Sequence, residues 1–209
     1  MHYERHIIKN FPKNYPSIKK IWANIIFFIG GTIIHPRKNH LKRTDLKRAK
    51  KVLKKGDIIL VGGLRRVSKL AISPKGCITH SMMYLGYRSF IHSIGDGVEI
   101  DGMHDIFCEY DTMIVLRTKN RPKAKIAKLL KTAKELLGTP YDFEFSKDNN
   151  KLYCTEFVYK CYKKSGLKTG IPKGTHPIRP ENFLNSSFEI VFTSHNLEII
   201  PKVNLIKQS

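Results

Sequence analysis

The sequence predicts one α+β domain preceded by a basic, partly apolar extension, and three observations carry this prediction. The 209 residues are 41% hydrophobic, which is enough for a sizeable core. After residue 56, short apolar runs rich in β-branched residues follow one another, each bounded by a turn signal. Amphipathic helical patterns lie before and after these runs. The chain is therefore expected to divide into residues 1–55 and residues 56–209.

Charge is distributed unevenly along the chain. The formal net charge is +21, yet residues 56–118 hold 6 basic and 7 acidic groups. Residues 1–55 hold 15 basic and 2 acidic groups, and residues 119–209 hold 17 and 8. A basic flank attracts nucleic-acid phosphates or anionic lipid headgroups through salt-sensitive Coulomb forces. A lysine-rich solvated surface explains the same excess equally well.

An apolar run of 14 residues, 21–34, lies between Lys19-Lys20 and Arg37-Lys38. It is shorter than the roughly 20 residues that span a bilayer, and no clear cleavage site marks a signal peptide. Contact with an anionic membrane surface through residues 19–55 is one interpretation, with Trp22 and the neighbouring phenylalanines at the headgroup boundary. A helix packed on the core is the alternative. The expected location is membrane-peripheral or cytoplasmic.

The elements of the domain follow in order. Residues 41–55 have the spacing of a basic amphipathic helix, and Gly56-Asp57 opens a buried strand at 58–61. Turn signals at Gly86–Arg88 and Gly95–Gly97 separate further strands. These strands are expected at 81–85, 89–94, 98–101 and 112–117, and together they predict a small antiparallel sheet.

The second half adds two helices. Residues 122–137 carry leucines, Ile126 and Ala133 on one face, with Gly138 as the cap. Residues 153–164 form the second helix, which ends at Gly166. A connection rich in proline and glycine over 168–187 then leads to closing strands at 188–192 and 197–200.

Three side chains from different elements are candidates for chemistry. Cys154 lies at the expected N-terminus of a helix, where the dipole and unbonded N–H groups lower a thiol pKa and bind an oxyanion. His80 and His92 lie on successive strands joined by a tight turn, which sets the imidazoles side by side. One histidine would act as the base and the other would orient it. Buried structural roles for each residue are the competing interpretation.

Other chemistries find less support in the sequence. Cys77, Cys108 and Cys161 form no C-x2-C pair and have no compact ligand set nearby, so no metal is expected. No zinc finger, RNP-like strand or glycine-rich phosphate loop is present, so no specific nucleic-acid partner is expected. Four cysteines are too few for a disulfide framework, and the thiols are expected to be free.

Five motifs resemble those of the permuted papain-like hydrolases, in particular the YiiX/YaeF-like branch of the NlpC-type superfamily, which is related to the lecithin:retinol acyltransferase-like enzymes. The resemblance covers residues 56–192, with histidine before cysteine. The motifs are Gly56-Asp57-Ile58-Ile59, Thr79-His80-Ser81, His92 before Gly97-Val98, Gly138-Thr139-Pro140-Tyr141-Asp142 and Tyr153-Cys154-Thr155-Glu156-Phe157-Val158.

The resemblance implies a papain-like, circularly permuted fold in which an antiparallel, barrel-like sheet packs on the cysteine helix. It also implies a thiol acyl-enzyme mechanism without a cofactor. Cys154 matches the nucleophile, His80 the general base and His92 the orienting position, which is a carboxylate in much of the YiiX-like branch. Tyr141 matches an aromatic residue beside the site, with either a hydroxyl-donating or a packing role.

The function predicted from the sequence is that of a monomeric cysteine hydrolase acting on an amide or ester of a peptide, acyl amino acid or lipid. A depressed pKa of Cys154 is expected to allow an ion pair with His80 near neutral pH. Two alternatives stay open: acyl transfer between lipids, and a catalytically idle module whose basic surface binds membrane or nucleic acid.

Overall fold

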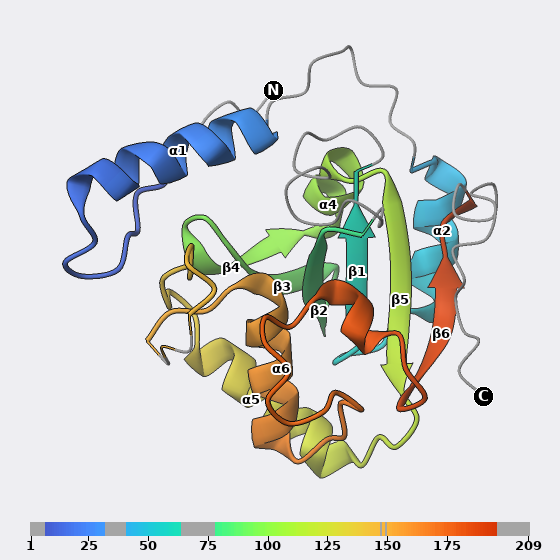
Figure 1. The fold of residues 1–209 in the computed structure, drawn as a ribbon. Helices are drawn as coiled ribbons and strands as arrows, with labels where there is room; N and C mark the ends of the chain where they lie inside the picture. Colours follow the sequence, from blue (N-terminus) through green and yellow to red (C-terminus); the bar gives the residue numbers. More distant parts are fainter. Residues whose placement is uncertain (1–6, 32–40, 64–77, 147, 149, 196–209) are drawn as a thin grey trace.

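A computed structural model describes residues 7–31, 41–63, 78–146, 148 and 150–195. Within these ranges, six strands form one sheet in the order β4-β3-β2-β1-β5-β6, and every neighbouring pair is antiparallel (Figure 1). The predicted α+β class with a small antiparallel sheet is thereby confirmed. The strands are β1 (Ile58–Gly62), β2 (His80–Gly86), β3 (Ser89–Ile94), β4 (Gly97–Gly102), β5 (Thr112–Thr118) and β6 (Phe188–Thr193).

Helices lie on both faces of this sheet and at its side. The α-helices are α1 (Ser17–Gly31), α2 (Arg43–Val52), α4 (Met103–Glu109), α5 (Lys123–Glu135) and α6 (Cys154–Ser165), with a short 3-10 helix η2 at Pro180–Phe183. Helix α1 lies apart from the sheet, beyond the β3–β4 hairpin (Figure 1). Helix α4 follows β4 without a connecting loop and was not predicted from the sequence, because seven residues are too few to show a helical period.

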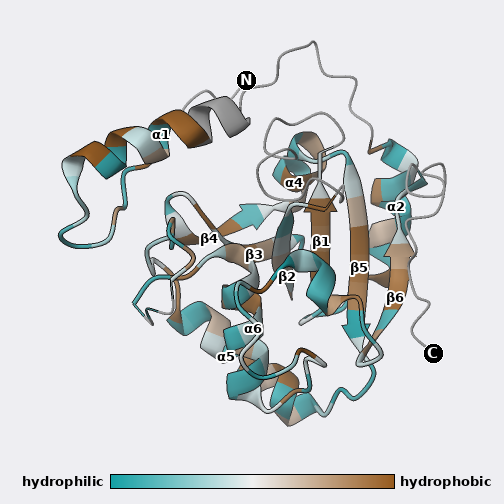
Figure 2. Cartoon of the chain, in the orientation of Figure 1, coloured by the Kyte–Doolittle hydropathy of each residue, from teal (hydrophilic) through white to brown (hydrophobic). Residues whose placement is uncertain are grey.

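The core has two layers because successive residues of each strand point to opposite faces of the sheet. Ile58 and Leu60 of β1 pack against α5 and α6, whereas Ile59 and Val61 pack with residues of α2 and α4. All four side chains are fully buried. The strands are among the most hydrophobic parts of the described chain, and hydrophilic residues are prominent on α2, α5 and α6 (Figure 2).

The hairpin between β2 and β3 fixes the register of the histidine-bearing strands. Tyr87 and Arg88 have φ angles of 51° and 63°, and Gly86 has 97°. Positive φ at both central residues is the geometry of the tight turn that matches the twist of a β-ribbon. The predicted turn at these three residues is confirmed.

The other expected elements agree with the structure to within two residues, apart from a shorter helix α2. The predicted strand at 197–200 lies outside the described residues. Over residues 18–26, where its side chains are described, helix α1 lacks the buried face expected of a helix packed on the core. These side chains are exposed except for Ala23 and the half-buried Lys20 and Asn24. No helix among the described residues is long and apolar enough to cross a membrane.

Candidate active site

Cys154 is the first residue of α6, and the preceding residues are fixed to the sheet. The N–H of Leu152 donates to the carbonyl of Pro140 at 2.9 Å, and the hydroxyl of Ser93 on β3 donates to the carbonyl of Leu152 at 2.6 Å. One residue after Cys154, the hydroxyl of Thr155 donates to the carbonyl of Ile178. These bonds place the N-terminus of α6, with its N–H groups that have no acceptor within the helix, against β2 and β3.

The thiol of Cys154 is buried, with 8% of the residue exposed. Burial raises its pKa above the usual value, although the N–H and hydroxyl groups of Ser81 and Thr155 act in the opposite direction. The expected depression of this pKa is therefore wrong for the free protein, because the loss of hydration outweighs the helix N-terminus. The thiol of the resting protein is protonated at neutral pH.

His80 is the first residue of β2, directly before Ser81, and the structure brings it together with His92. Nε2 of His80 lies 2.9 Å from Nδ1 of His92, and both residues are buried. The ring of Tyr110 stacks on that of His80, with 5.9 Å between centroids and 3° between planes. The hairpin and this stacked ring fix the orientation of the imidazole pair.

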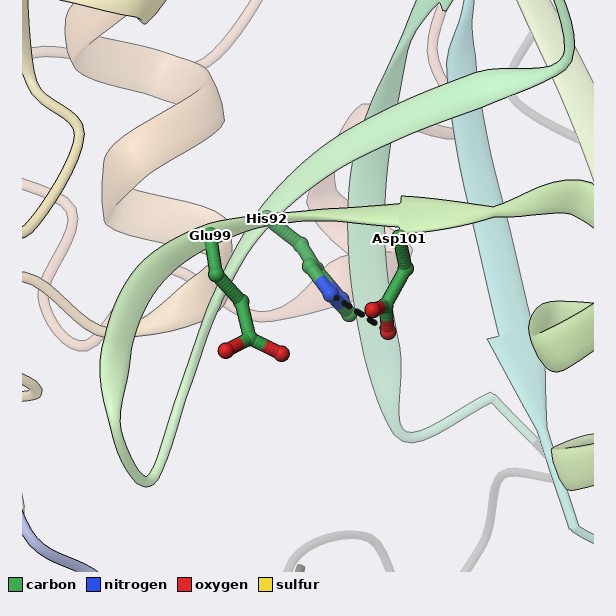
Figure 3. Close-up of side chains that lie close together, drawn as sticks. All are labelled: His92, Glu99 and Asp101. Atoms are coloured by element: carbon green, nitrogen blue, oxygen red, sulfur yellow. Dashed lines mark ion pairs between the residues drawn. The ribbon is translucent and has the colours of Figure 1, made fainter.

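Asp101 on β4 continues the series of contacts beyond the two histidines. Its Oδ2 lies 3.2 Å from Nε2 of His92, and Figure 3 shows the imidazole directed at the carboxylate. Asp101 is 4% exposed and His92 is 1% exposed. Asp101 was not predicted from the sequence. The sequence feature that could have indicated it is the alternation of Glu99 and Asp101 along β4, the strand that pairs with β3, which carries His92.

The same region contains a group of side chains with metal-ligating atoms. One atom each from His92, Glu99 and Asp101 lie within 4.8 Å of one another (Figure 3). One imidazole and two carboxylates suit zinc and other first-row divalent ions. Among the described cysteines, Cys154 and Cys161 are free, as expected. Cys77 lies outside the described residues.

Tyr141 lies in the turn that precedes α6, close to the site. The N–H of Val98 donates to the carbonyl of Thr139 at 2.9 Å, and the N–H of Gly138 donates back to Val98 at the same distance, which fixes this turn to β4. The pKa of Tyr141 is well above its usual value because of burial, with contributions from nearby Cys154 and Tyr110. Its hydroxyl therefore keeps its proton and can donate a hydrogen bond.

Glu156 lies two residues beyond Cys154, in the first turn of α6. Burial is the main cause that raises the pKa of this carboxyl to about 7. Two other histidines among the described residues are engaged elsewhere: His176 with the carbonyl of Phe145, and His195 with Asp45. His104 lies beside Cys108. None of these three was expected in the site.

A cysteine at a helix N-terminus beside an antiparallel sheet that carries paired histidines is the arrangement of the papain-like class, here with the histidines before the cysteine in permuted order. Residues 52–187 match the family of permuted papain-like amidases described as YaeF/YiiX. The chain belongs to this family, and the resemblance seen in the sequence is confirmed. The family supports a cysteine hydrolase.

Two curated relatives match parts of the chain. The uncharacterized protein YiiX of Escherichia coli strain K12 is 48% identical over 44 residues, which are 21% of this chain and 22% of YiiX. Protein OPG091 of Variola virus is 32% identical over 104 residues, which are 48% of this chain and 59% of OPG091. The chain therefore matches less than two thirds of the length of either relative.

A solved structure shares the fold over most of the described domain. It is titled as the crystal structure of metalloprotein yiiX from Escherichia coli O157:H7. The TM-score is 0.56 at 20% sequence identity, and the match covers 68% of this chain and 98% of that chain. At this identity, the likeness supports the permuted papain-like fold alone.

Proposed function

We propose that this amidase-family protein cleaves an amide or ester bond through an acyl-enzyme on Cys154, with His80 as the general base. The observation that carries the proposal is the contact between His80 and His92 beside a cysteine at a helix N-terminus. The thiol lies against Ser81, the chain neighbour of His80. Cys154 is the first residue of α6, and His80 is the first residue of β2.

In the first half of the cycle, His80 takes the thiol proton as sulfur attacks the substrate carbonyl. Nε2 of His80 contacts His92, so we assign proton transfer to Nδ1. The bond between Sγ and the carbonyl carbon forms, and the bond to the leaving amine or alcohol breaks as His80 returns the proton to that group. N–H groups at the start of α6 and the hydroxyl of Tyr141 stabilise the oxyanion.

In the second half, water takes the place of the leaving group. His80 accepts a proton from the water as oxygen attacks the thioester carbonyl, and the proton then returns to the departing sulfur. The products are a carboxylic acid and the free thiol, so atoms and charges balance without a cofactor. If an alcohol or amine replaces water, the same thioester yields the transfer reaction.

His92 and Asp101 hold the base in the required tautomer. With a proton on Nε2 that faces Asp101, His92 accepts from Nε2–H of His80 through its Nδ1, and this arrangement stabilises the imidazolium of His80. A metal ion held by His92, Glu99 and Asp101 would occupy the same Nε2. The proton of His92 would then lie on its Nδ1. His92 would donate the hydrogen bond to Nε2 of His80 and would no longer accept one from it. The proposed mechanism and an occupied metal site therefore oppose each other.

The test is to trap the acyl-enzyme with p-nitrophenyl acetate. We expect a burst of p-nitrophenol and one acetyl group on Cys154, located by peptide mass spectrometry after an acid quench. His80→Ala should slow acetylation by about 100-fold or more, the usual contribution of a general base. The main measurement is made with a metal chelator present. Adding zinc should slow the acetylation of Cys154.

Cys108→Ser is the matched control because Cys108 is the exposed thiol among the described residues. Acetylation of Cys154 no faster than that of Cys161 would contradict the hydrolase proposal and leave a binding module as the better account. Product analysis with water, glycerol or glycine as the acyl acceptor separates hydrolysis from transfer.

A further inference from the structure

Helix α1 presents a stripe of apolar side chains to solvent. Ile18, Ile21, Trp22, Ile25 and Ile26 are between 40% and 67% exposed. Their spacing of three and four residues places them on one side of the helix. The inner side carries the buried Ala23 and Asn24, whose Oδ1 accepts from the N–H of Ile8 at 2.6 Å. The exposed stripe is therefore a surface of the folded protein, and α1 is the hydrophobic helix at the side of the molecule in Figure 2.

The segment before α1 is fixed to the catalytic domain through the β3–β4 turn. The N–H of Lys9 donates to Oδ1 of Asp96 at 2.7 Å, and Nδ2 of Asn10 donates to the carbonyls of Asp96 and Gly138 at 3.0 and 3.2 Å. These bonds join residues more than 80 positions apart in the chain. They hold the start of the extension in a set place.

Aromatic contacts extend this link to the site. The ring of Phe11 lies 5.4 Å from that of Phe143, and the ring of Phe143 lies 5.1 Å from that of Tyr141. Lys19 of α1 forms an ion pair with Glu144. Tyr141 also lies near Cys154, which contributes to its raised pKa. The apolar stripe thus lies on a helix that one ion pair joins to the segment beside the nucleophile, and Phe11, which precedes the helix, packs on the same segment.

The charge around the stripe identifies its occupant. Residues 7–31 contain Lys9, Lys13, Lys19 and Lys20 and no acidic residue. Apolar side chains with lysines beside them suit the boundary of an anionic lipid surface. There the burial of apolar side chains and the Coulomb attraction of the lysines to the headgroups both favour binding. A second copy of this basic chain would bring like charges together. Nucleic acid would leave the apolar side chains without contacts.

We propose that α1 lies flat on an anionic phospholipid surface and thereby places the active site next to acyl groups carried by that membrane. This inference builds on the proposed hydrolase function and names the source of its substrate. Helix α1 has 15 residues and a length of about 22 Å, so it covers the interface without spanning it.

Trp22 makes the test direct because it is the single tryptophan in the sequence. Its fluorescence is measured in full-length Cys154→Ala protein, so that the result does not depend on catalysis. With vesicles of phosphatidylcholine and phosphatidylglycerol we expect a blue shift and quenching by brominated acyl chains. With phosphatidylcholine alone, or at high salt, binding should fall by about tenfold or more.

The double variant Ile21→Ser/Ile25→Ser keeps the reporter and should lower vesicle binding by about tenfold or more. The matched control Tyr87→Ser/Ile190→Ser removes two exposed apolar side chains elsewhere and should bind as the parent does. In protein with Cys154 intact, the Ile21→Ser/Ile25→Ser variant should also lower the rate on a vesicle-embedded long-chain p-nitrophenyl ester relative to the rate on p-nitrophenyl acetate.

An unchanged Trp22 spectrum with anionic vesicles would overturn the docking proposal. A concentration-dependent shift without vesicles would overturn it in favour of self-association, and a shift with RNA alone would overturn it in favour of nucleic acid. Failure of acetyl trapping at Cys154 while vesicle binding persists would instead contradict the hydrolase function and leave the docking surface intact.

Discussion

At the scale of single residues, the site depends on a hydrogen bond and an ion-pair contact, both made by His92. His92 bridges His80 and Asp101, at 2.9 and 3.2 Å. The buried carboxylate of Asp101 lies against the imidazole that contacts His80, so in the proposed cycle it can offset the positive charge that proton transfer from Cys154 creates. This arrangement compensates for a thiol whose own pKa burial raises. The base, more than the acidity of the thiol, is therefore expected to control reactivity.

Glu156 provides a residue-scale prediction about stability. Burial raises the pKa of its carboxyl from 4.5 to about 7, so the folded protein binds more protons than the unfolded chain between these values. Its contribution to stability is present below 4.5 and is lost as the pH rises to about 7. Glu156→Gln should therefore stabilise the protein at about pH 8, by at most about 3 kcal/mol, and have little effect near pH 4.

Urea unfolding of the parent and of Glu156→Gln at both pH values measures this difference. An equal effect at the two pH values would show that the carboxyl does not titrate differently on folding. Destabilisation by Glu156→Gln at the higher pH would contradict burial as the dominant cause.

At the scale of elements, a buried carboxylate joins α2, β1 and β5. Asp57 is fully buried and accepts hydrogen bonds from Nε and Nη2 of Arg117 at 3.0 and 2.7 Å. It also accepts from Nη1 of Arg121 at 2.9 Å and from the N–H of Lys54 at 2.8 Å. Asp57 belongs to the first motif of the domain, Gly56-Asp57-Ile58-Ile59, and its role is to fix α2, the helix that precedes the sheet.

Asp57→Asn should lower the free energy of unfolding by about 2 to 4 kcal/mol, because it leaves two guanidinium groups without a balancing charge. Thermal and urea unfolding measure the change. Glu135→Gln is the control, since Glu135 pairs with Lys131 at 3.9 Å on an exposed surface, and such pairs contribute up to about 1 kcal/mol. Similar losses in the two variants would contradict the structural role of Asp57.

Much of the fold could be predicted from the sequence because its signals are local. The run at 58–61, the turn at Gly86–Arg88 and Gly166 after the cysteine helix each determine their own segment. Gly166 has φ of 74°, the left-handed conformation that ends a helix. Helix α4 escaped prediction because tertiary packing of Met103 and Ile106 stabilises a segment too short to show a period.

Part of the candidate site could also be predicted, because the sequence signals for that part are local. His80 and His92 were placed together by a single hairpin, and Cys154 by the start of a helix. Asp101 depended on the register between β3 and β4, which hydropathy does not reveal. The raised pKa of Cys154 depended on how deeply the packed helix buries the thiol, and this is a property of the assembled structure.

At the scale of the whole molecule, hydrogen bonds and packing join the N-terminal segment to the domain that carries the candidate site. Asn10 reaches the carbonyls of Asp96 and Gly138, and α2 packs on the sheet through Ala49. The net charge of +21 acts over the whole molecule, whereas the apolar stripe is confined to α1. The proposed docking on an anionic surface rests on these two features together.

The central claim is that a protonated, buried Cys154 becomes a nucleophile because neutral His80 takes its proton. The most direct test is the pH dependence of Cys154 acetylation in the parent, His80→Ala and Glu156→Gln, followed by mass spectrometry. We predict that the parent rate falls as the pH is lowered and the base becomes protonated, and that His80→Ala reacts only at alkaline pH. Glu156→Gln separates the carboxyl that titrates at about 7 from the imidazole. A rate for His80→Ala equal to that of the parent at neutral pH would contradict the account.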